Sequence, residues 1–355
     1  MSERFDAVLV VSFGGPEKPE EVMPFLENVT RGRNIPRARL EEVAKHYHHF
    51  GGKSPINDQC RALVTALRDA LRERGPDVPV YWGNRNWRPC LADTVRVMER
   101  GGVTRALAFV TSAFGSYSGC RQYLEDIERA RADVGTTMRI EKLREFHDHP
   151  GFLQPMIERV RVARAWLERS ESGAELRDAP RGVRGAPPGE DSGGGGWADV
   201  LNPSDAPVIY TAHSVPSSMA ASSPYVAQLE ETCRAVSEGA GVARWELAWQ
   251  SRSGPPHVPW LEPDIVARLR ALREAGETDV VVAPIGFLSD HMEVLYDIDV
   301  EARAVAAEIG LRLARAGTVG THPRFIEMIR ELVTERVEGA PAAECAPGCC
   351  APPGR

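Results

Sequence analysis

Short runs of continuous apolar residues recur along this chain, and they constrain its fold more than any other feature. The runs VLVV, ALAFV, VIYTA and DVVVAPIGF contain few polar residues. Alternating apolar and polar residues are typical of a strand with one solvated face, whereas an unbroken apolar run is typical of a strand buried on both faces. The chain therefore predicts parallel sheets that are covered by helices on both sides.

Helical patterns separate the apolar runs. We predict strands at Ala7–Phe13, Val78–Gly83, Ala106–Thr111, Met138–Leu143, Val208–Ala212, Arg244–Gln250, Asp279–Ile285 and Leu311–Ala314. We predict helices at Gln59–Arg74, Leu91–Arg100, Gly119–Ala132, Pro224–Gly239 and Pro263–Ala275. Alternating strands and helices, with four strands in each half, predict an α/β fold of two similar doubly wound domains. Ligands of such sheets bind beyond the carboxyl ends of the strands.

The chain length agrees with two domains, because 355 residues divide into units of roughly 150 residues. We place the domains at 1–160 and 161–337, followed by a Cys-rich tail at 338–355. A stretch at about 170–205, rich in Gly and Pro, predicts a disordered insertion. No apolar stretch reaches ~20 residues, so we expect no membrane span. The N-terminal residues lack a signal-peptide pattern, so we expect a cytoplasmic protein.

Charge and cysteine content exclude other classes. The net charge of -7, from 43 Lys and Arg against 50 Asp and Glu, argues against a nucleic-acid-binding protein, which is usually basic. Seven cysteines fit a disulfide framework poorly because the number is odd. Three of them, Cys345, Cys349 and Cys350, crowd into the tail.

The segment GFLSDHMEVLYDIDVEA carries the densest group of chemically active residues. Glu293, Asp297 and Glu301 are spaced four apart, so they form one acidic stripe on an α-helix. Such a stripe is most often a solvated helix face. Here it begins next to Asp290 and His291, at the end of a predicted buried strand. Because carboxylate and imidazole ligands suit divalent cations, we predict a metal-guiding acidic ridge.

A second segment, VIYTAHSVP, ends a predicted buried strand at His213. Neutral imidazole binds divalent metals and can accept a proton near neutral pH. A lone histidine at a strand end is more often a structural hydrogen-bonding residue. A partner carboxylate would change that interpretation, and Glu293 is the natural candidate.

The segment WQSRSGPPHVPWLEPD contains Trp249 and Trp260 among prolines. These residues could form a rigid, flat-walled loop for a planar apolar ligand. A loop that packs on the core is an equally good interpretation.

Two further segments contain candidate binding residues. SFGGP lies at a strand–turn–helix start but lacks the GxGxxG dinucleotide fingerprint. Arg31 and Arg33 could pair with carboxylates, and Ser54, in the turn GGKSPI, could donate to one. In SAFGSYSGCRQYLED, Cys120 lies at a predicted helix start, which favours a thiolate. Tyr123, one turn later, faces a ligand or packs in the core.

Together, SFGGP, RGR, GGKSPI, TAHSVP, QSRSGP with a following WL, and GFLSDHMEVLYDID resemble the ferrochelatase family, and they occur in the family's order. The resemblance runs from residue 8 to about residue 330, apart from the insertion. It implies the chelatase fold: two Rossmann-like domains, each with a four-stranded parallel sheet flanked by helices, and a cleft between them. It also implies an enzyme of haem biosynthesis that inserts Fe²⁺, its substrate, into a porphyrin.

The resemblance also implies residue roles. His213 and Glu293 match the inner pair that contacts iron and helps to deprotonate the pyrrole nitrogens, and Asp297 and Glu301 would continue an outer acidic path. The matching substrate-binding positions are Phe13, Arg31, Arg33, Ser54 and Tyr123. Some bacterial relatives carry Tyr where this chain has Phe13, so we expect no axial iron ligand at that position.

A subset of the family holds a 2Fe–2S cluster through four cysteines, and Cys120, Cys345, Cys349 and Cys350 fit that arrangement. Zinc or free thiols are the alternatives.

The motifs RGRNIP, HFGGKSPIN and YSGCRQY are most similar to the bacterial branch that acts on coproporphyrin III, in which iron enters first and decarboxylation to haem follows. Protoporphyrin IX is the alternative substrate. A cobalt or nickel chelatase of another tetrapyrrole is the alternative enzyme. Non-enzymatic alternatives are an iron–sulfur sensor, a haem carrier and an exported solute-binding protein. Because haem precursors are insoluble and reactive, we also expect a handover partner for the product.

Overall fold

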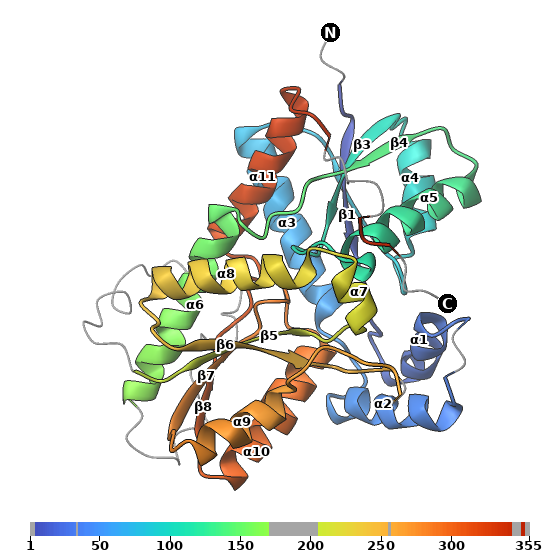
Figure 1. Ribbon diagram of the computed structural model, residues 1–355. Coiled ribbons are helices and arrows are strands. Elements are labelled where there is room, and N and C mark those ends of the chain that lie inside the picture. Colours follow the sequence, from blue (N-terminus) through green and yellow to red (C-terminus); the bar gives the residue numbers. More distant parts are fainter. Residues whose placement is uncertain (1–3, 33–34, 170–204, 255–256, 343–348, 352–355) are drawn as a thin grey trace. The chain divides into compact units, whose positions relative to one another are not determined.

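A computed structural model describes residues 4–32, 35–169, 205–254, 257–342 and 349–351 of the chain (Figure 1). These residues divide into two compact units, which are described separately. Unit 1 draws on Met1–Ser112, Ser118–Glu145 and Ile326–Pro347, and unit 2 on Ala113–Tyr117, Phe146–Phe325 and Gly348–Arg355. This division differs from a single boundary at residue 160, because residues 326–337 group with unit 1 and residues 146–160 with unit 2.

Unit 1 contains a parallel sheet of β1 (Ala7–Ser12), β2 (Val80–Asn84), β3 (Arg105–Val110) and β4 (Arg139–Lys142), in the order β2-β1-β3-β4. The helical elements of this part of the chain are η1 (Pro19–Glu21), α1 (Val22–Val29), α2 (Arg37–His49), α3 (Ile56–Arg74), α4 (Leu91–Arg100), the π-helix η2 (Tyr117–Arg121), α5 (Gln122–Val134) and α11 (Pro323–Val337).

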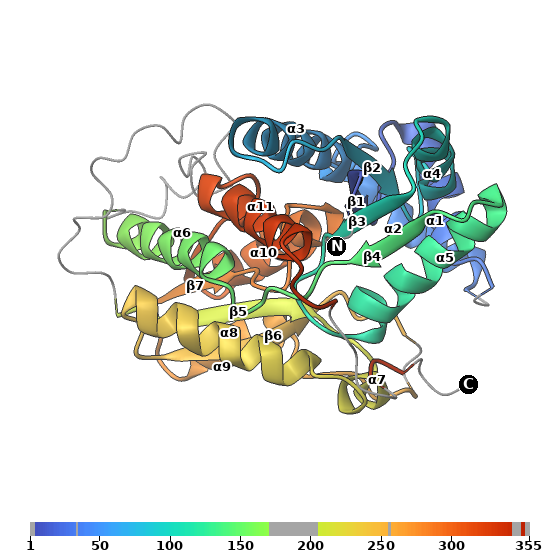
Figure 2. The same cartoon turned by 90° about the horizontal axis from the view of Figure 1, so that it is seen from above.

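Strand β1 is buried along its whole length. Because successive side chains of a strand point to opposite faces, Leu9 and Val11 face one side of the sheet and Val8 and Val10 the other. The first side packs against the apolar stripes of α4 and α5. Figure 2 shows α4 and α5 on one side of this sheet and α3 on the other. Burial on both faces explains the unbroken apolar run.

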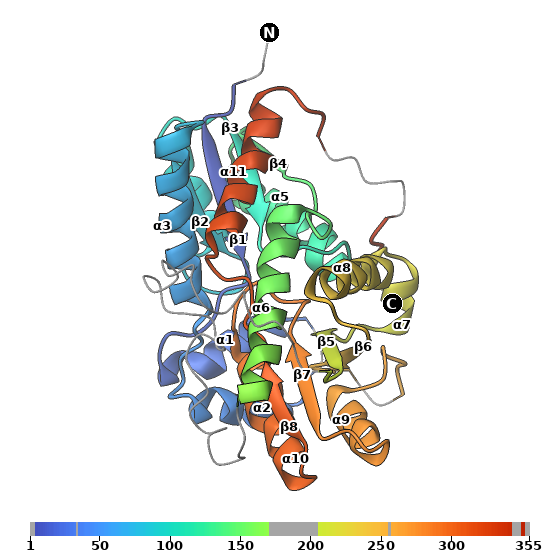
Figure 3. The same cartoon turned by 90° about the vertical axis from the view of Figure 1, so that its left-hand side faces the viewer.

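Unit 2 contains a second parallel sheet of β5 (Val208–His213), β6 (Trp245–Gln250), β7 (Asp279–Ala283) and β8 (Arg312–Arg315), in the order β6-β5-β7-β8. Its helical elements are α6 (Pro150–Arg169), α7 (Ser217–Ala221), α8 (Tyr225–Ala240), α9 (Ile265–Glu274), the π-helix η5 (Val294–Ala302) and α10 (Arg303–Glu308). Helices α9 and α10 pack with η5 on one face of this sheet. Figure 3 shows α6 lying over β7 and β8.

The predicted fold, with two four-stranded parallel sheets flanked by helices, is confirmed. The largest differences in strand boundaries are two residues, at Val78 against Val80 and at Ile285 against Ala283. The predicted insertion at 170–205 lies outside the described residues, apart from Asp205. In the part of the chain that the structure describes, no helix combines the length and apolarity needed to cross a membrane.

Candidate functional site

His213 is the last residue of β5, a strand with neighbours on both sides in the sheet of unit 2. Its ring Nδ1 donates a hydrogen bond to the Ser214 carbonyl oxygen at 2.5 Å. A carbonyl can only accept, so this contact fixes the proton on Nδ1 and turns Nε2 toward the site. Nε2 lies 3.7 Å from Glu293 Oε1, a charge contact longer than a hydrogen bond.

Gly286 brings the chain after β7 against β5. Its N–H donates to the Thr211 carbonyl oxygen at 3.0 Å. A Cβ at this position would lie 2.6 Å from the Ala212 Cβ, closer than two carbon atoms can approach. Only glycine therefore permits this contact, which places the following residues, and Glu293 among them, beside His213.

Glu293 immediately precedes the π-helix η5. The predicted acidic stripe assumed an α-helix, and that assumption is wrong. The i→i+5 bonding of a π-helix widens the turn, so residues four apart do not stack directly above one another. Of the three acids, Glu293 and Asp297 are half-buried and Glu301 is exposed. Widened turns of this kind occur frequently at functional sites.

The charges of His213 and Glu293 stabilise one another. Burial disfavours the charged form of each group, but the neighbouring charge outweighs burial. The pKa of His213 is raised to about 9, with a further contribution from the Ser214 carbonyl, and the pKa of Glu293 is lowered to about 2. Near neutral pH the pair is therefore an imidazolium and a carboxylate. The two side chains remain 34% and 46% exposed, so solvent and solutes reach them.

Asp297 is held by the end of β6. The Ser251 hydroxyl donates to its carboxylate, and the Gln250 amide donates to it at 3.4 Å and to the Glu293 carbonyl oxygen at 3.2 Å. Burial, followed by the charges of Glu293 and Glu301, raises the pKa of Asp297 to about 7 despite the bond from Ser251. A carboxyl group with this pKa can accept and release a proton near neutral pH.

His291 adds a second imidazole beside the pair. Its Nδ1 accepts a hydrogen bond from the Glu293 backbone N–H at 3.2 Å, and its ring packs against Phe287 at 4.8 Å between centroids. Burial lowers the pKa of His291. The site therefore contains two imidazoles next to Glu293, one charged and one uncharged.

Of the two interpretations that the sequence left open for Trp249, a wall for a planar ligand and packing on the core, the structure supports the second. Its side chain is 4% exposed and packs against the Tyr225 ring at 6.0 Å between centroids. It therefore belongs to the core of unit 2. Trp260 is half-buried, and its indole fills the space where a side chain at Gly254 would stand.

The predicted substrate-binding residues lie in unit 1, whereas the residues of the His213 site lie in unit 2. Phe13 is 38% exposed and contacts the Phe25 ring edge-on at 6.3 Å. Ser54 is buried against Gly15, and Arg31 is exposed. Arg33 lies outside the described residues. Tyr123 is 5% exposed in the core of the unit.

The predicted cluster cysteines are only partly described. Cys120 is buried beside the Glu145 carboxylate. The Sγ atoms of Cys349 and Cys350 are 3.5 Å apart, and Cys350 has a left-handed backbone with φ 55°. Cys345 lies outside the described residues. Within the described ranges, no three or more His, Cys, Asp and Glu side chains form a metal-binding group.

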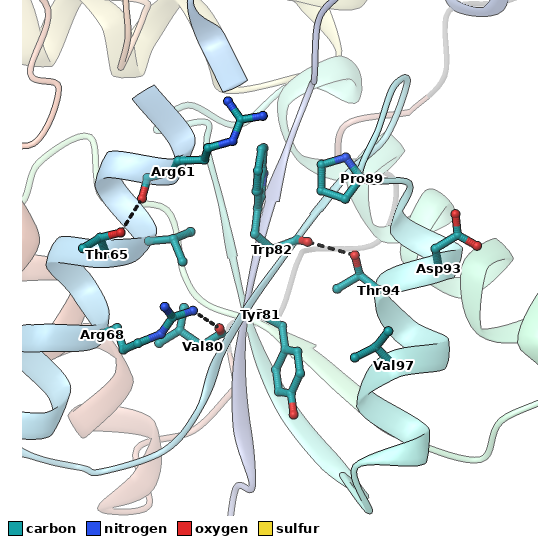
Figure 4. Close-up of a pocket in the computed structure, with 11 residues that line it drawn as sticks. Arg61, Thr65, Arg68, Val80, Tyr81, Trp82, Pro89, Asp93, Thr94 and Val97 are labelled. Carbon is teal, nitrogen blue, oxygen red and sulfur yellow. Dashed lines mark hydrogen bonds between the residues drawn. The ribbon is translucent and has the colours of Figure 1, made fainter. Parts of the chain in front are cut away.

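An open cavity of about 580 Å³ lies along β2, between α3 and α4 (Figure 4). None of the predicted site residues lines it. Arg68 and Thr94 reach β2 from opposite sides of this cavity. Arg68 Nη2 donates to the Val80 carbonyl oxygen at 3.1 Å, and Thr94 Oγ1 donates to the Trp82 carbonyl oxygen at 2.8 Å.

Sequence reasoning missed two residues that support the site, Gly286 and Arg315. Arg315 lies in the strand sequence RLARA and is completely buried. A charged side chain within an apolar strand was the available signal, because buried arginines require acidic partners. Those partners are Asp290 and Asp299, on the same segment as Glu293.

Comparison with known proteins gives a consistent result. A family model described as Ferrochelatase matches residues 5–176 and 194–337, which leaves unmatched only part of the predicted insertion between them. The coproporphyrin III ferrochelatase of Nocardia farcinica is 48% identical over 371 residues, covering 98% of this chain and 97% of the relative. That of Frankia alni is 49% identical, covering 98% and 87%, and the ferrochelatase of Rhodopirellula baltica is 46% identical, covering 94% and 86%.

Among solved structures, the sirohydrochlorin chelatase SirB from Bacillus subtilis subspecies spizizenii, in complex with cobalt, superimposes with a TM-score of 0.52. The two sequences are 12% identical, and the match covers 94% of this chain and 96% of SirB. At this identity the likeness concerns the fold alone.

Proposed function

The chain belongs to the ferrochelatase family, and on that premise we propose that it inserts Fe²⁺ into coproporphyrin III to give Fe-coproporphyrin. The observation that carries the site assignment is the His213–Glu293 pair, 3.7 Å apart at the carboxyl end of a buried strand. The substrate assignment is supported by relatives of 44% to 49% identity that are named coproporphyrin III ferrochelatases.

We propose that His213 and Glu293 receive the incoming iron. Without metal they neutralise each other as an imidazolium and a carboxylate. A divalent cation binds the neutral imidazole, so its arrival displaces the proton from Nε2 while Nδ1 keeps its bond to Ser214. Glu293 remains a carboxylate throughout and balances the charge of the metal.

Insertion exchanges two pyrrole protons for one Fe²⁺, so the site needs an acceptor. We propose Asp297, whose pKa of about 7 lets it accept a proton and pass it on at neutral pH. Ser251 and Gln250 orient this carboxylate. Exposed Glu301, in the same π-helix, would connect the relay to solvent.

Metal entry also requires a bent macrocycle, because the nitrogen lone pairs of a flat porphyrin converge in its plane. Binding energy from groups that hold the rest of the substrate can supply this strain. We propose that Phe13 contacts the ring and that Arg31, Arg33, Ser54 and Tyr123 contribute to carboxylate and ring recognition. Phe13 has no ligating atom, so iron receives no axial ligand from it.

We further propose that Cys120, Cys345, Cys349 and Cys350 hold a 2Fe–2S cluster. These four residues would supply the four thiolates that such a cluster requires. A cluster ligand must be a thiolate, so loading would release any proton that these thiols carry. The cluster is proposed as a structural or sensing element, because the catalytic steps use His213, Glu293 and Asp297.

The deciding experiment is anaerobic Fe²⁺ insertion into coproporphyrin III and protoporphyrin IX in parallel, followed by absorbance. The proposal expects strong preference for coproporphyrin III. Preference for protoporphyrin IX would support iron insertion as the reaction but would contradict the assignment of coproporphyrin III as the substrate. Folded protein that metallates neither would overturn the activity, and cobalt and nickel with other tetrapyrroles would then be assayed.

A handover partner for the product is part of the same proposal. Fe-coproporphyrin is a reactive iron porphyrin, so direct transfer to the decarboxylating enzyme is expected. Transfer rates that rise in proportion to the concentration of that enzyme would support direct transfer. Rates independent of its concentration would indicate release into solution.

A further inference from the structure

Arg315 is the most deeply buried charged side chain near the site. It ends β8, and 1% of its surface is exposed. Removing a guanidinium from water costs free energy unless hydrogen-bond acceptors surround it. A buried arginine is therefore bound by acceptors in a fixed geometry.

Two carboxylates bind the guanidinium through three of its hydrogen bonds. Arg315 Nη1 and Nη2 donate to Asp290 Oδ1 and Oδ2 at 3.0 and 3.2 Å, a bidentate pair. Arg315 Nε donates to Asp299 Oδ1 at 2.8 Å. The Thr318 hydroxyl donates to Asp290 Oδ1 at 3.2 Å, which fixes that carboxylate from another side. Planar, bidentate pairing of this kind determines orientation as well as distance.

The two acids lie on either side of the reactive residues in the sequence. Asp290 precedes His291 and Glu293, whereas Asp299 lies within η5, beyond Asp297. A guanidinium bonded to both acids therefore fixes the segment at two points, and the reactive residues lie between them. A π-helix is a rare conformation that persists where its surroundings hold it, and here Arg315 holds it from the strand beneath.

We infer that Arg315 is a positioning residue for metal insertion: through its bonds to Asp290 and Asp299 it sets the place of Glu293 and Asp297 relative to His213. This inference rests on the proposed function of that site. Arg315 itself contacts neither iron nor porphyrin. Its effect passes through the backbone of residues 290–299, which it binds at both ends.

The test uses Arg315→Lys, which keeps the charge and both carboxylates but lacks the planar fork. The matched control is Arg312→Lys, in the same strand and paired with Asp279 on the neighbouring strand. Removing a group that orients metal ligands typically costs about 10- to 100-fold in affinity or activity. We expect that loss in kcat for Arg315→Lys, with the KM for porphyrin and the unfolding temperature near those of Arg312→Lys.

A second readout does not depend on turnover. Co²⁺ titration, with His213→Ala as the reference for a lost site, is expected to show about 10-fold weaker binding in Arg315→Lys. Asp299→Asn, which leaves the Asp290 pair intact, should show a smaller change in the same direction. Unchanged Co²⁺ affinity and kcat in folded Arg315→Lys would overturn the inference. Weakened Co²⁺ binding in a protein whose wild type metallates no porphyrin would overturn the proposed function and the role in insertion, and would leave Arg315 as a positioning residue for metal binding alone.

Discussion

The two sheets share one topology but carry different chemistry at equivalent places. Strand order is β2-β1-β3-β4 in unit 1 and β6-β5-β7-β8 in unit 2, so β1 corresponds to β5 and β3 to β7. A π-helix follows both β3 and β7. Yet β1 is followed by Phe13 and two glycines, whereas β5 ends in His213. The backbone supplies the same platform twice, and the residues at the strand ends decide what each platform can do.

The largest expected effect tests the charged end of unit 2. His213→Ala and Glu293→Gln should each abolish measurable iron insertion, because each removes a proposed ligand of the incoming iron. His322→Ala is the matched control, because His322 forms another His–Glu pair in the same unit, with Glu158 at 3.0 Å. Near wild-type turnover in either site variant, with normal folding, would remove that residue from the mechanism.

The second prediction concerns pH and sharpens the role of the π-helix after β7. Since the pKa of Asp297 is raised to about 7, its carboxyl is protonated below that pH and ionised above it. An acceptor must be ionised, so kcat should fall as pH drops through about 7. Asp297→Asn should lower kcat by about 100-fold and abolish this acidic limb. If kcat of Asp297→Asn still falls as pH drops through about 7, this pH dependence belongs to another group.

The third prediction concerns the apolar end of unit 1. Phe13→Ala should raise the KM for porphyrin about 10-fold, because burying a phenyl ring contributes at least about 1.5 kcal/mol. Its kcat should fall far less than that of His213→Ala, since Phe13 contacts the ring and none of the reacting atoms. A fall in kcat with unchanged KM would show that Phe13, after β1, takes part in the reaction as His213 does at the end of β5. Unit 1 would then not be limited to substrate binding.

The smallest expected effect on turnover concerns the π-helix of unit 1. Cys120→Ser should lose the visible absorption of the proposed cluster and leave kcat nearly unchanged. Cys233→Ser, at a cysteine buried in the core of unit 2, should keep the colour. Full colour and iron content in Cys120→Ser would show that this cysteine is not a ligand.

The sequence predicts the fold well because two-sided burial leaves a strong local signal. An unbroken apolar run such as VLVV has few structural alternatives, and the strands lie where such runs occur. The pairing of His213 with Glu293 was also predictable, since both follow buried strands and the carboxyl ends of parallel strands meet at one edge of the sheet.

Other features of the site depend on tertiary contacts and could not be predicted from the sequence. The acidic spacing of Glu293, Asp297 and Glu301 suggested an α-helix, because nothing local distinguishes a π-helix from it. For Trp249 the sequence was equally consistent with a ligand wall and with packing on the core, and the folded structure places it in the core. The hydrogen bond between Arg315 and Asp299 forms only when β8 and η5 pack together.

The outer side of β2 has a consequence for the behaviour of the whole protein in concentrated solution. In the described part of the chain, β2 is a terminal strand. The backbone N–H and C=O groups of its even-numbered residues point away from β1. An exposed row of such carbonyls is a template on which a strand from another molecule can add, the first step of edge-to-edge aggregation. Because Arg68 and Thr94 already occupy the Val80 and Trp82 carbonyl oxygens, that template is blocked. Two side chains remote from catalysis thus disfavour aggregation through the edge of this sheet.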